Sequence, residues 1–93
     1  DLPFIFGKFE IESFLEFKKN IIDANFDYIE IKKLFFFKSG RWDIELKSGL
    51  LIKLPNENVK SSFKFLLKFL DENNNKKINI IDLRLTNQVI ING

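Results

Sequence analysis

Residues 41–55 read RWDIELKSGLLIKLP, and this stretch decides the fold of the chain. Every second residue is apolar on both sides of a Ser48-Gly49 step. These residues are Trp42, Ile44 and Leu46 before the step and Leu50, Ile52 and Leu54 after it. Because successive side chains of a strand point to opposite faces, the spacing indicates two strands with one apolar face. Gly49 suits a tight turn, and Pro55, which has no N–H to donate, ends the second strand. We therefore predict a β-hairpin.

The composition fits one small domain with a single core. The chain has 93 residues, of which 45% are hydrophobic, and no stretch approaches the roughly 20 consecutive apolar residues of a transmembrane helix. A net charge of +2, from 15 basic and 13 acidic residues, argues against a dedicated nucleic-acid binder. The absence of Cys argues against a disulfide framework. Since the chain does not begin with Met, we expect it to be part of a longer protein.

Two segments have helical periodicity. Residues 10–22 begin with Glu and have Lys near their end, as the helix dipole favours. The predicted inward stripe of this helix is Ile11, Phe14, Leu15, Lys18 and Ile22. Residues 59–72 follow N-cap candidates at positions 56–58. The predicted inward stripe of this second helix is Val59, Phe63, Leu66, Leu67 and Leu70. Phe65 and Phe69 lie off that stripe, so we expect the second helix to be apolar on more than one side.

The remaining apolar segments predict further strands. In residues 28–38, Ile29 and Ile31 are expected to face inward, but the run 34–37 is continuously apolar. This run indicates either a β-bulge or a strand buried on both faces, and we favour the bulge. Residues 78–85 place Ile81, Leu83 and Leu85 on one face. A turn at Thr86-Asn87-Gln88 then leads to a short final strand, Val89–Ile91.

These elements together predict an α+β domain. Their order is β-α-β-β-β-α-β-β, which gives a mostly antiparallel sheet of about five strands with two helices packed on one face. Residues 1–9 form a short opening segment, which Pro3 restricts to extended geometry. We expect this segment to lead in from a preceding domain and residues 10–93 to form the domain itself.

The residue types argue against an enzyme. The sequence has no His and no Cys, which removes the commonest general base and the thiolate nucleophile. Asp43 and Glu45 have the spacing to chelate a hard cation, but a solvated strand face explains them better. Trp42 is in phase with the apolar residues, so it is expected in the core rather than in a ligand site. We expect no catalytic residue, no cofactor and no metal.

Two features are candidate binding surfaces. Lys60, Lys64 and Lys68 repeat every four residues, which suits either contact with an anionic lipid or nucleic acid or, more simply, a solvated helix face. The final strand, Val89–Ile91, is expected at a sheet edge. Unpaired N–H and C=O groups at such an edge can template a partner's strand or self-association. From the residues alone, a plain edge is equally compatible.

Three runs of the sequence resemble one family. The stretch 41–55 looks like the Trp-bearing hairpin in the extracytoplasmic β domain of FtsQ, a bacterial cell-division protein called DivIB in Gram-positive bacteria. Residues 81–91, IDLRLTNQVII, resemble the closing strand pair of that domain, and residues 2–7, LPFIFG, resemble its opening. The three runs span nearly the whole chain and follow the order of the family.

The resemblance implies a non-enzymatic scaffold of the division machinery. Such proteins have one N-terminal membrane helix, then a POTRA domain, then this β domain on the periplasmic side of the inner membrane at the division site. The implied partners are homologues of FtsB and FtsL, with no nucleic acid, and a segment of FtsB adds to the last strand. The implied partner-binding residues are Arg41, which precedes the Trp, and Leu85, Thr86, Asn87, Gln88, Val89, Ile90 and Ile91.

Overall fold

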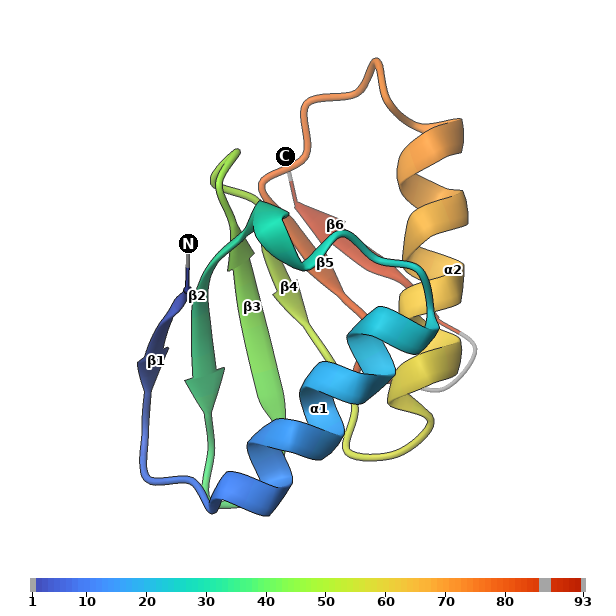
Figure 1. Cartoon of the computed structure of the whole chain (residues 1–93). Helices are drawn as coiled ribbons and strands as arrows, with labels where there is room; N and C mark the ends of the chain where they lie inside the picture. The colour runs from blue at the N-terminus through green and yellow to red at the C-terminus, as the bar shows by residue number, and fades with distance from the viewer. Residues whose placement is uncertain (1, 86–87, 93) are drawn as a thin grey trace.

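The computed structural model describes residues 2–85 and 88–92, which form a six-stranded sheet and two α-helices (Figure 1). The strands are β1 (Phe4–Phe6), β2 (Ile31–Phe36), β3 (Trp42–Leu46), β4 (Leu51–Lys53), β5 (Ile80–Asp82) and β6 (Ile90–Asn92). The helices are α1 (Ile11–Asp23), α2 (Val59–Glu72) and the short 3-10 helix η1 (Tyr28–Glu30). The predicted α+β class and element order are confirmed. The sheet has six strands, which is the number in the predicted element order, rather than about five.

The strands lie in the sheet in the order of the chain, and the mixed pairing explains where the helices lie. β1 pairs with β2 and β4 with β5 in parallel, while the other three pairs are antiparallel. A parallel pair needs a crossover connection, which α1 and α2 supply. Each crossover joins a strand to its next neighbour in the sheet, β1 to β2 and β4 to β5, and these four strands all run in the same direction. Because such connections are right-handed, both helices lie on one face of the sheet, as predicted.

The central hairpin is confirmed. Trp42, Ile44 and Leu46 are buried, and Gly49 adopts a positive φ of 96° in the turn. Ile44 pairs with Ile52, so the apolar faces of β3 and β4 coincide. The same row continues across the whole sheet and faces the helices. Its members are Ile5, Leu34, Ile44, Ile52, Ile81 and Ile91.

The predicted inward side of α1 was partly wrong. Phe17, Ile21 and Ala24 are buried instead, whereas Ile11, Leu15 and Ile22 are exposed. The Phe17 ring stacks on the Trp42 indole with ring centres 4.8 Å apart and planes 9° apart. The helix is apolar on two sides, and the side that carries Phe17 gains this aromatic contact with β3.

The chain before and within β2 also differs from the expectation. Ile29 is exposed because it lies in η1, where its N–H donates to the Asp27 carboxylate at 3.1 Å. The register of β2 against β3 shifts between Ile31 and Lys33, so β2 contains a bulge, but the bulge lies before the run 34–37 for which it was predicted. The bulge lets both Ile31 and Leu34 face the core.

Helix α2 follows the prediction closely. Phe63 and Leu66 are fully buried, and Val59, Leu67 and Leu70 pack against the core. Phe65, off the stripe, is exposed, and its ring stacks on Phe69 with centres 6.0 Å apart. Lys60, Lys64 and Lys68 are all exposed.

Candidate partner-binding surface

Strand β6 forms one edge of the sheet. Ile90, Ile91 and Asn92 pair with β5, and among residues 2–85 and 88–92 no strand pairs with the opposite side of β6. Ile91 lies on the helix side and Ile90 on the outer side, and both remain about half exposed. Val89 packs partly against the core. The structure therefore places the predicted last strand at an edge with apolar side chains on both faces.

Two predictions for the connection before β6 need comment. Leu85 was expected to share the buried face of Ile81 and Leu83, but it is exposed. Strand β5 ends at Asp82, so the alternation no longer governs residue 85. Gln88 is exposed and its N–H donates to the Leu85 carbonyl at 3.4 Å. Thr86 and Asn87 of the predicted site lie outside the described residues.

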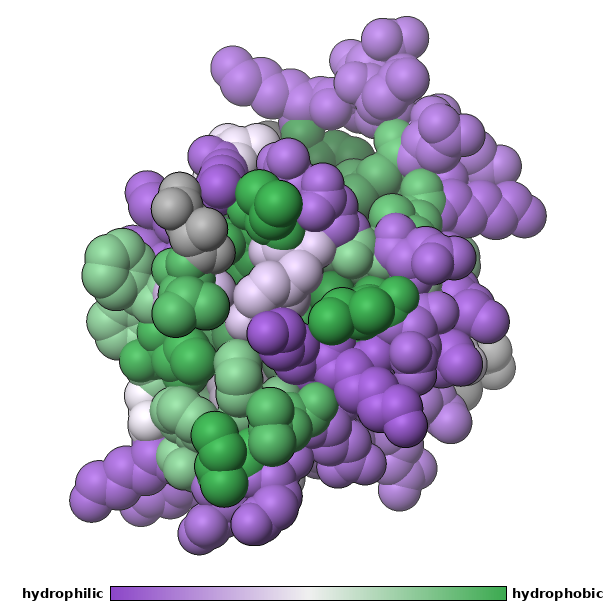
Figure 2. All heavy atoms as spheres, in the orientation of Figure 1, coloured by the Kyte–Doolittle hydropathy of each residue, from purple (hydrophilic) through white to green (hydrophobic). Residues whose placement is uncertain are grey.

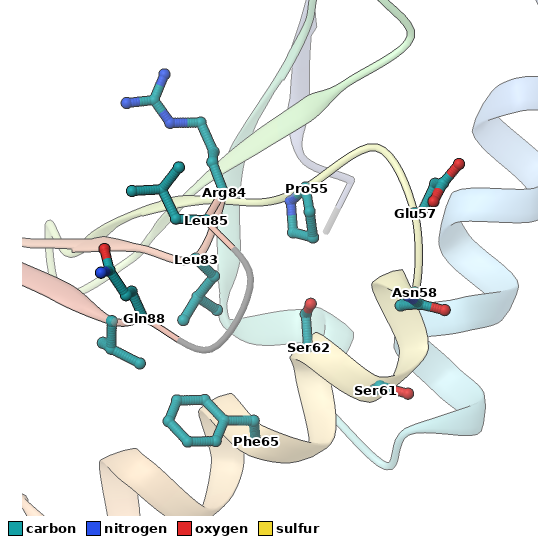
Figure 3. A pocket seen from close by; sticks show the side chains of 11 residues that line it. Pro55, Glu57, Asn58, Ser61, Ser62, Phe65, Leu83, Arg84, Leu85 and Gln88 are labelled. Carbon is teal, nitrogen blue, oxygen red and sulfur yellow. The ribbon is translucent and has the colours of Figure 1, made fainter.

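A groove lies beside this edge, between the end of β5 and the first half of α2 (Figure 3). Its volume is about 480 Å³. In Figure 3, Leu83 points toward α2, where Ser62 and Phe65 lie, while Arg84 points away. Gln88 and Val89 line the side next to β6. Sequence reasoning missed this groove, although the off-stripe position of Phe65 was the signal that α2 carries an apolar flank.

The outer face of the sheet carries a row of charges. Asp43, Lys53 and Asp82 are in register on β3, β4 and β5, and the next residue of that row is Ile90 on β6. Arg84 holds the Asp82 carboxylate with three side-chain hydrogen bonds of 2.7 to 3.1 Å. This contact lowers the pKa of Asp82 and raises that of Arg84.

Arg41 lies next to Asp43, at the β3 end of this row, and its guanidinium makes three contacts. Its Nη1 donates to the Asp43 carboxylate and to the Leu54 carbonyl, the latter at 3.1 Å. Its guanidinium lies 4.6 Å from the centre of the Phe37 ring. Asp43 was expected on a solvated face, but it is only 4% exposed because Arg41 covers it.

The structure does not bring Arg41 and β6 together. Both have side chains on the outer face, but β4 and β5 lie between β3 and β6. Three strand spacings amount to about 15 Å. A partner that contacts both must therefore span that distance across the sheet.

Among residues 2–85 and 88–92, no group of three His, Cys, Asp or Glu is placed to hold a metal ion. Within the same residues, no helix has the length and apolar character needed to cross a membrane.

The fold and this surface define a class: a small α+β domain whose edge strand and charged sheet face suit protein contact. Residues 2–84 match the model of a family described as cell division protein FtsQ/DivIB, C-terminal. The chain therefore belongs to the FtsQ/DivIB family, whose members are non-catalytic division proteins. A search among curated proteins finds no match. The family match ends at Arg84, just before the connection to β6.

Proposed function

We propose that this chain is the β domain of a periplasmic division-site scaffold that binds FtsB and FtsL homologues, and that it performs no catalysis. The observation that carries the proposal is the edge position of β6, which pairs with β5 on one side only among the described residues. Its outward N–H and C=O groups are placed to pair with an added strand of an FtsB-like segment. Main-chain hydrogen bonds would then give affinity and side-chain contacts specificity.

The side chains around β6 indicate what such a strand would carry. On the helix side it would lie beside Ile91, with Val89 and the exposed ring of Phe65 near by. On the outer side it would lie beside Ile90. We therefore expect an added strand with apolar residues on both faces, one of them large enough to enter the groove between Leu83 and Phe65.

Arg41 is the second proposed contact, reached by a segment that crosses the sheet before or after the added strand. Its Nη1 is anchored to Asp43 and Leu54, whereas the described residues offer no hydrogen-bond partner to its Nε or Nη2. The Nε–Nη2 edge of a guanidinium fits a carboxylate with two parallel hydrogen bonds. Because the side chain is already fixed, an acidic group of the partner would bind it with little ordering cost.

The position of the domain in the cell is part of the proposal. We place it on the periplasmic side of the inner membrane, joined through residues 1–9 to a POTRA-like domain and an N-terminal membrane anchor. The pairing of Phe4–Phe6 with β2 supports a fixed connection to the preceding domain, because it holds the opening segment against the sheet. Self-association through β6 would compete with the partner for the same edge.

An NMR titration tests strand addition. The 93-residue chain is titrated with the FtsB homologue of the same organism, and large amide shifts are expected at residues 88–92 and at Arg41. Ile90→Lys places a charge on the edge and should weaken binding at least tenfold. Phe4→Lys makes a similar change on the opposite edge strand and is the matched control.

Three outcomes would count against this proposal. Equal effects of Ile90→Lys and Phe4→Lys would mean that β6 is not the docking edge. Shifts confined to Lys60, Lys64 and Lys68 would mean that the partner docks on the basic face of α2 and not on β6. An absence of shifts with a folded domain would leave β6 as a plain edge.

A further inference from the structure

Helix α1 has a second apolar side that no described residue covers. Ile11, Leu15 and Ile22 are 58%, 54% and 52% exposed, while the opposite side of the same helix is buried against the sheet. Figure 2 shows hydrophobic residues gathered over β1 and the start of α1, whereas hydrophilic ones dominate over α2. Exposed aliphatic side chains aligned on one helix indicate a contact surface rather than chance exposure.

The spacing of these residues is that of a coiled-coil seam. Ile11, Leu15, position 18 and Ile22 are separated by four, three and four residues, which is the a/d pattern of a heptad repeat. Position 18 is Lys, and its Nζ lies 4.9 Å from the centre of the Tyr28 ring. A Lys at one seam position lowers stability but restricts the register in which two such helices fit.

The charges beside the seam indicate which helix fits. Glu12 and Lys19 directly follow two seam positions and lie one heptad apart on the same flank, where both are exposed. In an antiparallel pair, this flank of one helix faces the same flank of the other. Glu12 of each copy then lies next to Lys19 of the other copy, which gives two ion pairs per dimer. Glu16 and Asp23 lie farther round the helix from the seam.

We propose that α1 is a homodimer interface, in which two copies pack their α1 helices antiparallel about a twofold axis. Ile11 packs against Ile22 of the second copy at both ends, and Leu15 against Lys18 in the middle. The contact is self-complementary, as a twofold interface requires. Two 13-residue helices bury less than the ~800 Å² per partner of a standard interface, so the dimer is weak and concentration-dependent.

This interface is separate from the proposed FtsB-binding edge. Through Phe17, α1 packs on Trp42 of β3, while β6 lies three strands away in the sheet. Self-association through α1 therefore leaves β6 accessible. Loss of one interaction leaves the other intact, so the two proposals can fail independently.

A dilution series of the 93-residue chain tests the proposal. NMR spectra from about 10 μM to about 1 mM should show concentration-dependent shifts at Ile11, Leu15, Lys19 and Ile22. Glu12→Lys and Lys19→Glu should each weaken self-association roughly fivefold to tenfold, because each turns two attractive pairs into repulsive ones. The double variant, and an equal mixture of the two single variants, should associate as the native chain does.

Glu16→Lys is the matched control, since it makes the same charge change on the same helix outside the interface. Its effect should be less than about twofold. All three substituted positions are solvent-facing, and unchanged shifts of the buried core verify folding in each variant. Three results would overturn the proposal: no concentration dependence up to about 1 mM, equal effects of Glu16→Lys and Glu12→Lys, or no recovery in the double variant. The seam would then be left for a different partner.

Discussion

At the scale of single residues, the outer face of the sheet departs most from its sequence pattern. From the alternation in β3, both Asp43 and Glu45 are expected to be charged residues on a solvent-exposed face. In the structure Asp43 is buried under Arg41, whereas Glu45 remains partly exposed, 4.0 Å from Lys33. A carboxylate of this kind depends on its partner, because a buried charge without one is costly.

Asp43→Asn should therefore lower the free energy of unfolding by about 1–3 kcal/mol. The substitution removes the charge that Arg41 neutralises and leaves the guanidinium half-buried beside an amide. Urea denaturation followed by Trp42 fluorescence measures the change. Glu45→Gln is the control and should cost less than about 0.5 kcal/mol, because its ion pair with Lys33 is partly solvated. A similar cost for both variants would show that burial of Asp43 contributes nothing.

Asp82 makes the stability dependent on pH. Hydrogen bonds from Arg84 hold the pKa of Asp82 below its ordinary value of 3.8. A carboxyl with a lowered folded pKa contributes stability that is complete above its unfolded pKa and is lost as the pH falls through the folded pKa. Asp82→Asn should therefore flatten the loss of stability below about pH 4, as measured by urea denaturation at a series of pH values. An unchanged acid profile would contradict this role.

At the scale of elements, α1 illustrates why periodicity alone is ambiguous. Its 13 residues contain two apolar sides, and either satisfies the three- and four-residue spacing of an amphipathic helix. The side with Phe17 and Ile21 faces the sheet, because there the rings of Phe17 and Trp42 stack. The aliphatic side, which the sequence favoured, is the one left exposed.

Two neighbouring isoleucines of α1 test this orientation with the same substitution. Ile21 is 0% exposed and Ile22 is 52% exposed. Ile21→Ala should cost about 2–5 kcal/mol of unfolding free energy through the cavity that it leaves. Ile22→Ala should cost less than about 0.5 kcal/mol, measured at a concentration low enough to keep the chain monomeric. The reverse order would mean that the helix packs through the face predicted from sequence.

At the scale of the whole molecule, the two crossovers make the two faces of the sheet different, because they place both helices on one face. Both helices cover one face, so the charged row from Arg41 to Arg84 lies on the other. The sheet ends in β1 and β6, and β6 lies next to the groove on α2. The proposed binding surface is therefore assembled from the end of the chain, one flank of α2 and the outer face.

The near-balanced charge of the molecule predicts how its partner binding responds to salt. With a net charge of +2 and Arg41 and Arg84 already paired with Asp43 and Asp82, added salt should weaken FtsB binding by less than about tenfold between 50 and 200 mM. A surface that binds polyanionic phosphates through many lysines would lose about 10³-fold or more over that range. Calorimetric titrations at several salt concentrations distinguish the two.

The sequence by itself determined the elements and their order. Local patterning was sufficient to predict the hairpin, α2 and the α+β class. The signals used were the strict alternation around Gly49, the Phe63–Leu66 stripe and the turn residues, and each of them involves only a few neighbouring positions. The sequence also predicted a terminal strand at a sheet edge, because the last strand of a fold commonly lies at an edge.

Only the tertiary structure decided which side of an element is buried and which is exposed. The orientation of α1 depends on Trp42, which lies far along the chain from Phe17. The burial of Asp43 depends on Arg41, whose guanidinium also binds the more distant Leu54 carbonyl. Leu85 is exposed because β5 ends at Asp82. The groove next to β6 likewise exists only because the right-handed crossover sets α2 against the end of β5. Local periodicity states that a side chain is apolar or charged, but packing between elements decides what it contacts.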